Sequence, residues 1–390
     1  MKLFILFFTL LYFVPLFSQV KEENQIPQQN INSISISSPS LADSVQVETL
    51  QEIKIMNNKL RKREEISDSE SDYKVAPSAS DKFIQKKKFA SSQASSRSAD
   101  ILLQNEMDKD VLSLKTQDPN SFNYYLFYYM AGNYNIEREN ELKKAEKLDP
   151  TNPEVLSQSI GNAMVKGDAI ATKTYVEKLK GNKLLSEEAI SYAEDLILSS
   201  IDNQVLVTHG FFDSYGVAFQ QYAENFHPEL TTISLDLMQS ESYRKLVAEK
   251  GFLLPLDNII NVNYLTAFCD LNSDKRIALS MTLPKEYLLP LKESLFPIGL
   301  VFEYRNSGSH FESNDVDRNA QLWNQILLKE NINTFSSSES NNLSSNYLPM
   351  LIFLKSAYEL NKEPDKFERI EKALDFTARK SGKLSLLKKQ

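Results

Sequence analysis

The chain has 390 residues, of which 42% are apolar and 25% charged, and its 44 basic and 52 acidic side chains give a formal net charge of −8. These values are typical of a soluble globular protein and exclude a collagen, a disulfide-rich miniprotein and a polytopic membrane protein. The acidic balance argues against nucleic-acid binding, and one Cys with three His leaves no internal disulfide and no cysteine-rich metal centre. We therefore expect neither a metal nor a cofactor.

Residues 1–18 have the layout of a secretory signal peptide. Lys2 precedes an apolar run that Pro15 ends, and Ser18 is a small residue at which cleavage would leave Gln19 as the new N-terminus. The run is short for a membrane span of ~20 residues, so cleavage is favoured over an uncleaved anchor helix. We expect an exported protein, periplasmic or extracellular, with no membrane span after cleavage.

Residues 19–97 are rich in serine and in blocks of charge, and they contain no glycine. Such a segment buries too little apolar surface to offset the loss of backbone entropy, so the composition predicts a disordered linker. Lys86, Lys87 and Lys88 form a basic run within it. A solvated charge run is the favoured interpretation, ahead of a phosphate or lipid patch.

Residues 98–185 read as helices joined by short turns. Asn120 or Ser121 can cap a helix that Gly132 ends, and further helices are expected over 136–148, from Pro153 onward and over 169–179. The run 145–154, Ala-Glu-Lys-Leu-Asp-Pro-Thr-Asn-Pro-Glu, with the later Gly-Asp turn, resembles tetratricopeptide repeats, whose unit is a helix pair of ~34 residues. We expect Leu148 and Leu156 to be buried between these helices.

Residues 186–310 alternate between strands and helices. Strands are expected over 204–208, 231–237, 275–282 and 298–304, with a helix between the first two. A strand–helix–strand unit implies a parallel pair. The predicted fold is therefore an α/β body with a mixed, partly parallel sheet of about four strands, preceded by tetratricopeptide-like helical hairpins and a long disordered N-terminal tail.

The same segment resembles the soluble C-terminal portion of bacterial protein O-mannosyltransferase-like membrane proteins. The resemblance is carried, in order, by the runs 205–215, 232–238, 276–282 and 299–304. Within the first run, His209 replaces an asparagine of the family pattern, and Phe211 and Phe212 replace an Asp-Asn pair. The multi-spanning half that would carry glycosyl transfer is missing, so the resemblance implies a detached accessory domain.

The loop after the first strand is the candidate site. Ligands of parallel α/β units gather beyond the carboxyl ends of the strands, and this loop lies at that place. Asp213 and Ser214 are good N-cap residues for the next helix, and capping is the favoured explanation. The alternative is a small polar pocket for a sugar or peptide group. Its candidate ligand-binding residues are His209, Gly210, Asp213, Ser214 and Tyr215.

Residues 311–390 are expected to form C-terminal helices, over 346–360 and 364–378, and a basic tail. Cys269 is expected to be a small core residue. No nucleophile elbow, phosphate-binding glycine loop or zinc-protease motif occurs in the chain, so no catalytic residue is assigned.

The features together favour an exported, non-catalytic binding or scaffold protein of the cell envelope. Its partner would be a protein or peptide in the envelope, with a glycan as the other candidate. The alternative is a glycan-related enzyme, or an accessory subunit of a transferase, that uses the loop 209–215.

Overall fold

The computed structural model describes residues 77–93, 95–305, 309, 311, 313–328 and 343–387. The signal-peptide expectation for 1–18 and most of the linker expectation for 19–97 lie outside the described residues. Within the described part of the chain, no helix is long and apolar enough to cross a membrane.

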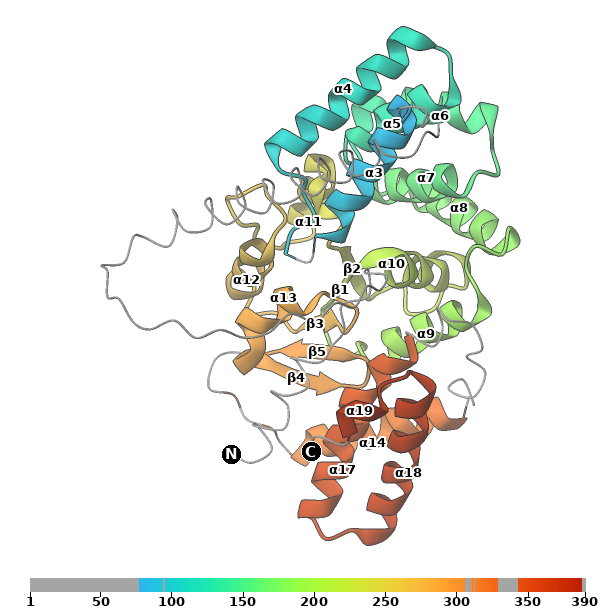
Figure 1. The fold of residues 1–390 in the computed structure, drawn as a ribbon. Coiled ribbons are helices and arrows are strands. Elements are labelled where there is room, and N and C mark those ends of the chain that lie inside the picture. The colour runs from blue at the N-terminus through green and yellow to red at the C-terminus, as the bar shows by residue number, and fades with distance from the viewer. Residues whose placement is uncertain are drawn as a thin grey trace, which may run out of the picture. The chain divides into compact units, whose positions relative to one another are not determined.

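One five-stranded sheet forms the centre of the body (Figure 1). Its strands are β1 (Val205–Thr208), β2 (Thr231–Ser234), β3 (Ile277–Ser280), β4 (Leu295–Ile298) and β5 (Val301–Tyr304), in the order β2-β1-β3-β5-β4. β1 is parallel to both β2 and β3, whereas β5 is antiparallel to β3 and β4. The expected mixed, partly parallel sheet is confirmed, but it has five strands where about four were expected.

The additional strand is β4, which pairs with β5 through a tight hairpin. Ile298 faces Val301 across the pair, and only Gly299 and Leu300 form the turn. Gly299 has φ +57°, a left-handed conformation that glycine adopts at little cost. Pro297 lies within β4, which is possible because β4 is an edge strand and an edge strand can lack one N–H donor.

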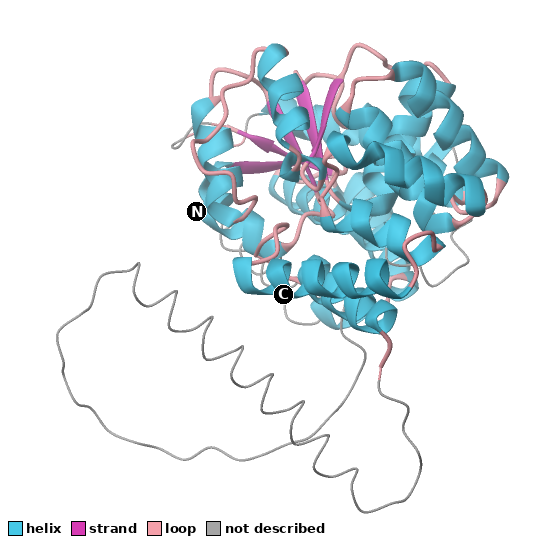
Figure 2. Cartoon of the chain, turned by 90° about the horizontal axis from the view of Figure 1, so that it is seen from above, coloured by secondary structure: helices cyan, strands magenta, loops and turns pink. Residues whose placement is uncertain are grey.

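Helices cover both faces of the sheet (Figure 2). Leu206 and Ala278 pack into a core with α9 (Glu187–Leu198) and α10 (Gly210–Ala218). Their strand neighbours point the opposite way, into a second core with α11 (Glu241–Glu249), α12 (Val262–Leu271) and α13 (Lys285–Leu288). Because both faces are buried, β1 and β3 are continuously apolar apart from their last residues, Thr208 and Ser280. Cys269 is fully buried in the second core, as expected.

The N-terminal helices enclose a third core. α3 (Ala79–Ser92), α4 (Ile101–Gln117), α5 (Phe122–Ala131) and α6 (Glu139–Leu148) pack around Phe83, Met107 and Tyr129. Ser121 caps α5 and Gly132 ends it, as the sequence predicts. α3 differs from expectation, because it lies in the stretch interpreted as a linker. Its Phe83 is fully buried and stacks on Phe127 at 4.7 Å between ring centroids.

α7 (Pro153–Val165) joins the three cores, and α8 (Ala169–Gly181) packs beside it. Val155 belongs to the third core, Leu156 and Ile160 to the first, and Val165 to the second. Leu156 is fully buried, as expected. The expectation for Leu148 is wrong: it is 56% exposed, because α6 buries only Leu142 and Ala145 and Leu148 ends the helix beyond them.

The C-terminal helices follow the sheet in the chain. They are α14 (Ser313–Leu328), α17 (Leu348–Leu360), α18 (Pro364–Lys380) and the short α19 (Leu384–Leu387). α17 packs against α14, α18 and β4. The two helices predicted over 346–360 and 364–378 correspond to α17 and α18.

Candidate functional site

The carboxyl ends of the three parallel strands meet at one edge of the sheet. From β1 the chain passes through α10 to β2 on one side, whereas β3 lies on the other side of β1. Open α/β sheets bind ligands at such a switch point. His209 follows β1, Asp236 lies shortly after β2, and Thr282 lies shortly after β3, so polar residues from three strands converge here.

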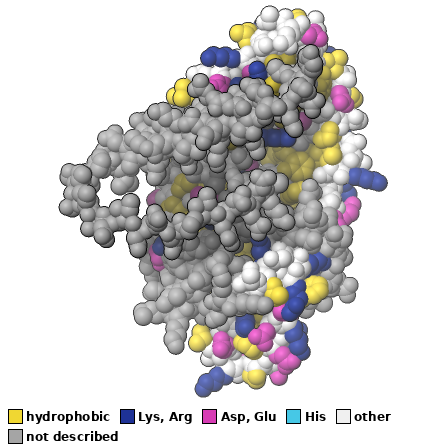
Figure 3. Space-filling view, viewed as in Figure 1, with side chains coloured by type: hydrophobic (Ala, Val, Ile, Leu, Met, Phe, Trp, Pro, Cys, Tyr) yellow, Lys and Arg dark blue, Asp and Glu magenta, His cyan; other side chains and the backbone are white. Residues whose placement is uncertain are grey.

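A cavity of about 690 Å³ lies at this edge, within the size range of small-molecule sites. The helices α3 and α5 supply most of its apolar lining, with Ile84, Ala90, Phe122, Leu126, Phe127 and Met130. The start of α7, the start of α10 and the loop after β2 supply most of the polar lining. Hydrophobic side chains gather in a hollow between α7 and α10 on the face shown in Figure 3.

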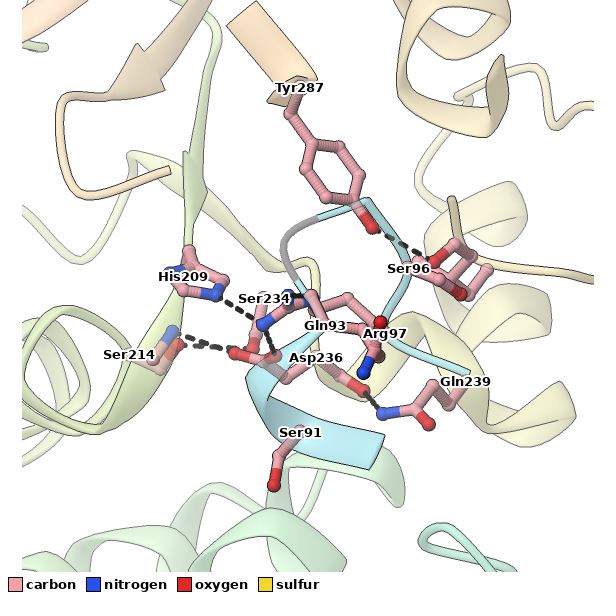
Figure 4. Close-up of polar contacts among 12 residues, drawn as sticks. Ser91, Gln93, Ser96, Arg97, His209, Ser214, Ser234, Asp236, Gln239 and Tyr287 are labelled. Atoms are coloured by element: carbon pink, nitrogen blue, oxygen red, sulfur yellow. Dashed lines mark hydrogen bonds and ion pairs between the residues drawn. The ribbon is translucent and has the colours of Figure 1, made fainter. Parts of the chain in front are cut away.

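Arg97 lies at the centre of the polar network (Figure 4). Its Nη1 donates to His209 Nε2 at 2.8 Å and lies 3.9 Å from Asp236 Oδ1, and its Nη2 donates to the Gln93 carbonyl. The guanidinium also lies over the Tyr287 ring, 5.8 Å from the centroid. The segment that carries Arg97 is held in place, because the Arg97 N–H donates to the Ile260 carbonyl at 2.7 Å.

His209 is the N-cap residue of α10 and is held as a neutral imidazole. Burial lowers its pKa, and the Arg97 guanidinium lowers it further, against an opposing attraction from Asp236. A guanidinium only donates hydrogen bonds, so Nε2 must be the unprotonated acceptor. The lone pair that a general base would use is therefore engaged by Arg97.

The first turn of α10 is capped by Asp236, which lies in the loop after β2. Gly210 has φ +76°, and its N–H donates to Asp236 Oδ2 at 2.7 Å. An aspartate at a helix N-terminus is favourable both as a hydrogen-bond acceptor and as a charge near the helix dipole. The expectation that Asp213 or Ser214 caps this helix is wrong, because α10 begins three residues before Asp213 and both side chains have other partners.

Asp213 is buried beneath the cavity instead of facing it. The hydroxyls of Ser280 and Thr282, from the end of β3, both donate to its Oδ2. Its Oδ1 has no hydrogen-bond partner among the described residues. Burial raises the pKa of this carboxyl to about 6, and the two hydroxyl hydrogen bonds oppose that shift.

The other predicted residues line the cavity. Ser214 Oγ lies 3.1 Å from Thr208 Oγ1 and donates to Ser234 Oγ at 3.1 Å, which ties α10 to the ends of β1 and β2. The Tyr215 hydroxyl donates to the Ser157 carbonyl of α7 at 2.8 Å. Of the five candidate residues, His209, Gly210, Ser214 and Tyr215 therefore lie on one cavity wall, and Asp213 lies behind it.

Lys87 of α3 also lines the cavity. Its Nζ donates to the Met130 carbonyl at 3.1 Å and to Asn133 Oδ1 at 2.7 Å. Burial lowers the pKa of its ammonium to about 8, with a smaller opposing effect from Glu154. Lys87 is therefore no member of a solvated charge run, and its neighbour Lys86 is tied to Asp110 at 2.9 Å.

Sequence reasoning missed Arg97, Asp236 and Lys87. Arg97 and Lys87 lie in the stretch whose composition predicted a linker, and Asp236 was placed inside a longer second strand. The available signal was the position of Asp236 at the carboxyl end of a parallel strand. The described residues contain no group of His, Cys, Asp and Glu side chains that could hold a metal ion.

No family model, no curated protein and no solved structure matches this chain. The two family resemblances described above stay predictions from the sequence.

Proposed function

We propose that this is an exported, non-catalytic binding protein of the cell envelope, whose ligand occupies the cavity at the carboxyl ends of β1 and β2. A small molecule, or the end of a peptide or glycan chain, fits a cavity of about 690 Å³. The observation that carries the proposal is the position of this cavity, at the switch point of the sheet and beneath the helices α3, α5 and α7.

The state of the polar groups favours binding over catalysis. His209 Nε2 accepts from Arg97, and both acceptor contacts of Asp213 Oδ2 come from hydroxyls. A general base must reach the proton that it abstracts, with its lone pair free to accept it. His209 does not meet that condition because Arg97 engages the lone pair of its Nε2. Asp213 does not meet it because it lies behind the cavity wall, although its Oδ1 has no hydrogen-bond partner among the described residues. A fixed network of this kind is well suited to orient a ligand.

We also propose that the neighbouring pairs α5–α6 and α7–α8 are tetratricopeptide-like hairpins that act as a scaffold. Each pair packs together. Asn152 caps α7 through the N–H groups of Glu154 and Val155, so the turn before α7 is built by the residues that carry the resemblance. In this proposal the hairpins hold the polar lining from α7 against α10.

A thermal-shift screen tests the binding function. Wild-type protein is heated with panels of saccharides, short peptides and small organic acids, beside Ser91→Trp and Ser92→Trp. Ser91 lines the cavity and is exposed on α3, whereas its exposed neighbour Ser92 does not line it, so the two variants differ in whether they block the site. We expect ligands that raise the melting temperature of wild type and of Ser92→Trp but not of Ser91→Trp.

Mass spectrometry of the ligand after incubation separates binding from catalysis. Recovery of the ligand unchanged is the expected result. Conversion of the ligand would favour the glycan-related enzyme, and a screen without any stabilising compound would contradict a binding function for the cavity.

A further inference from the structure

The cavity has more positive than negative charge in its lining. The cations are Lys87, Lys88 and Arg97, and the carboxylates are Glu154 and Asp236. Asp236 accepts from Gly210 and faces Arg97, so the charges of Asp236 and Arg97 offset each other, whereas Glu154 Oε1 accepts from the neutral amide of Gln158 at 2.8 Å. With three cations against two carboxylates, the net charge of the described lining is positive.

Lys87 is a half-buried cation of the lining without an ion-pair partner among the described residues. Its two hydrogen bonds go to neutral oxygens, those of Met130 and Asn133, and no described carboxylate lies within ion-pair distance. Lys87 is half-buried, and an ammonium that is partly removed from water and hydrogen-bonds only to neutral acceptors is costly; burial lowers its pKa to about 8. An anion in the cavity would lower that cost.

Two further donor groups lie in the lining of the same cavity. Arg97 Nε is buried and has no hydrogen-bond partner among the described residues. At the start of α10, only the N–H of Gly210 has a side-chain acceptor in the described part of the chain, although the first four N–H groups of a helix lack partners within the helix. Both groups of donors would stabilise an anion bound in the cavity.

Part of the remaining lining is apolar, and this part favours an anion that carries an apolar body. Phe122, Leu126 and Phe127 of α5, with Ile84 of α3 and Phe211 of α10, offer hydrocarbon and aromatic surface. A phosphate or another small, strongly hydrated ion would leave this surface unused. A molecule that joins an apolar body to one anionic group would use both parts of the cavity.

We propose that the cavity binds a small organic acid, with its carboxylate paired to Lys87 and its apolar body against the apolar side chains of α3 and α5. This inference rests on the proposed binding function and names the ligand chemistry. Lys87 supplies the charge that distinguishes an acid from its neutral analogue.

Three ligands of matched shape test the proposal by isothermal titration. They are 3-phenylpropionate, 3-phenylpropionamide and 3-phenylpropylamine, which share one apolar body and differ in the charge of its end group. We expect the acid to bind wild-type protein at least roughly tenfold more tightly than the amide, because a hydrogen bond to a charged group contributes about 1.5–3 kcal/mol. The amine should bind more weakly than either.

Lys87→Met removes the ammonium and keeps a side chain of similar length. In this variant the acid should lose its roughly tenfold advantage while the amide binds as it does to wild type. Lys82→Met is the matched control, since Lys82 is exposed on the same helix and does not line the cavity. It should retain the wild-type preference for the acid, and melting temperatures of both variants show whether α3 stays folded.

The outcomes separate this inference from the proposed function. Equal binding of acid and amide, tighter binding of the amine, or no effect of Lys87→Met would overturn the organic-acid inference and leave a binding cavity in place. The same holds if none of the three compounds binds but a saccharide or peptide in the screen does. A screen in which no compound of any class binds would overturn both.

Discussion

At the scale of single residues, the candidate site depends on how buried polar groups are paired. Arg97 pairs with His209 and Asp236, whereas Asp213 pairs only with hydroxyls. A cation partner stabilises a buried carboxylate in its charged form, and hydroxyls do so much less. We therefore expect the ionisation of Asp213 to make the free energy of unfolding depend on pH.

The pKa of Asp213 gives a prediction for stability against pH. Burial raises it from 3.8 to about 6, so the folded state binds the proton more tightly than the unfolded state. The stabilisation is full below about pH 4 and is lost as pH rises through about 6, with a magnitude on the order of 3 kcal/mol for a shift of this size. Asp213→Asn cannot titrate and should lack this loss.

Urea unfolding of wild type and Asp213→Asn at pH 4, 5, 6 and 7 measures the effect. The difference in unfolding free energy between the two should change in favour of the variant as pH rises from 4 through 6, and it should level off by about pH 7. Curves that run parallel across this range would show that Asp213 keeps an ordinary pKa.

The sequence predicted several residues that line the cavity but did not predict the charged residues Arg97, Asp236 and Lys87. The position of His209 after an apolar strand, followed by Gly210, identified the carboxyl edge of the sheet, and four of the five candidate residues line the cavity. Arg97 lies 112 positions before its partner His209. A contact of that sequence separation leaves no local pattern, and the charge-rich composition around Arg97 indicated solvent.

At the scale of secondary-structure elements, α7 is the helix whose packing matters most. Its residues contribute to all three cores, and the helix follows a turn fixed by Asn152 and Pro153. The exposed and buried leucines on either side of this turn make a matched pair for mutation.

Leu156→Ala should lower the free energy of unfolding by about 2–5 kcal/mol, because it leaves a cavity at a fully buried position. Leu148→Ala should change it by less than about 0.5 kcal/mol, since Leu148 is largely exposed. Chemical denaturation of both variants measures the difference. Similar costs at the two positions would contradict the packing of α7 between the cores.

Local sequence signals located elements whose ends are fixed by short-range interactions. The cap residue Ser121 and the Gly167-Asp168 turn gave the starts of α5 and α8, because capping and turn formation are short-range interactions. β4 was missed because Pro297 reads as a break, and only its place at the sheet edge makes a proline acceptable there. α12 was missed as well, and its start is held by the side chain of Asn261.

At the scale of the whole molecule, the described end of the stretch assigned to a linker belongs to the body. α3 and the segment that carries Arg97 pack against the body through Phe83, His209 and Ile260. The body therefore requires residues that composition alone would assign to a tail.

A chain that begins at Pro77 should melt close to the full-length protein, whereas one that begins at Ser98 should melt at a clearly lower temperature. The second chain loses the buried Phe83 and the Arg97 network. Calorimetry of the two chains measures the difference. Equal melting temperatures would contradict the packing of α3 against the third core.

Export is a prediction from residues 1–18 alone. Mass spectrometry of the protein from its native host should find an N-terminus near Gln19, in an exported fraction. Cytoplasmic protein with Met1 intact would contradict it.

The central claim is that the cavity between α3, α5, α7 and the carboxyl ends of β1 and β2 is a ligand site. Isothermal titration of the most stabilising compound from the screen into wild type, Ser92→Trp and Ser91→Trp tests it most directly. We predict one molecule bound per chain in wild type and in Ser92→Trp, and at least tenfold weaker binding in Ser91→Trp at an unchanged melting temperature. Equal affinity in all three proteins would contradict the claim, because it would place the ligand elsewhere on the molecule.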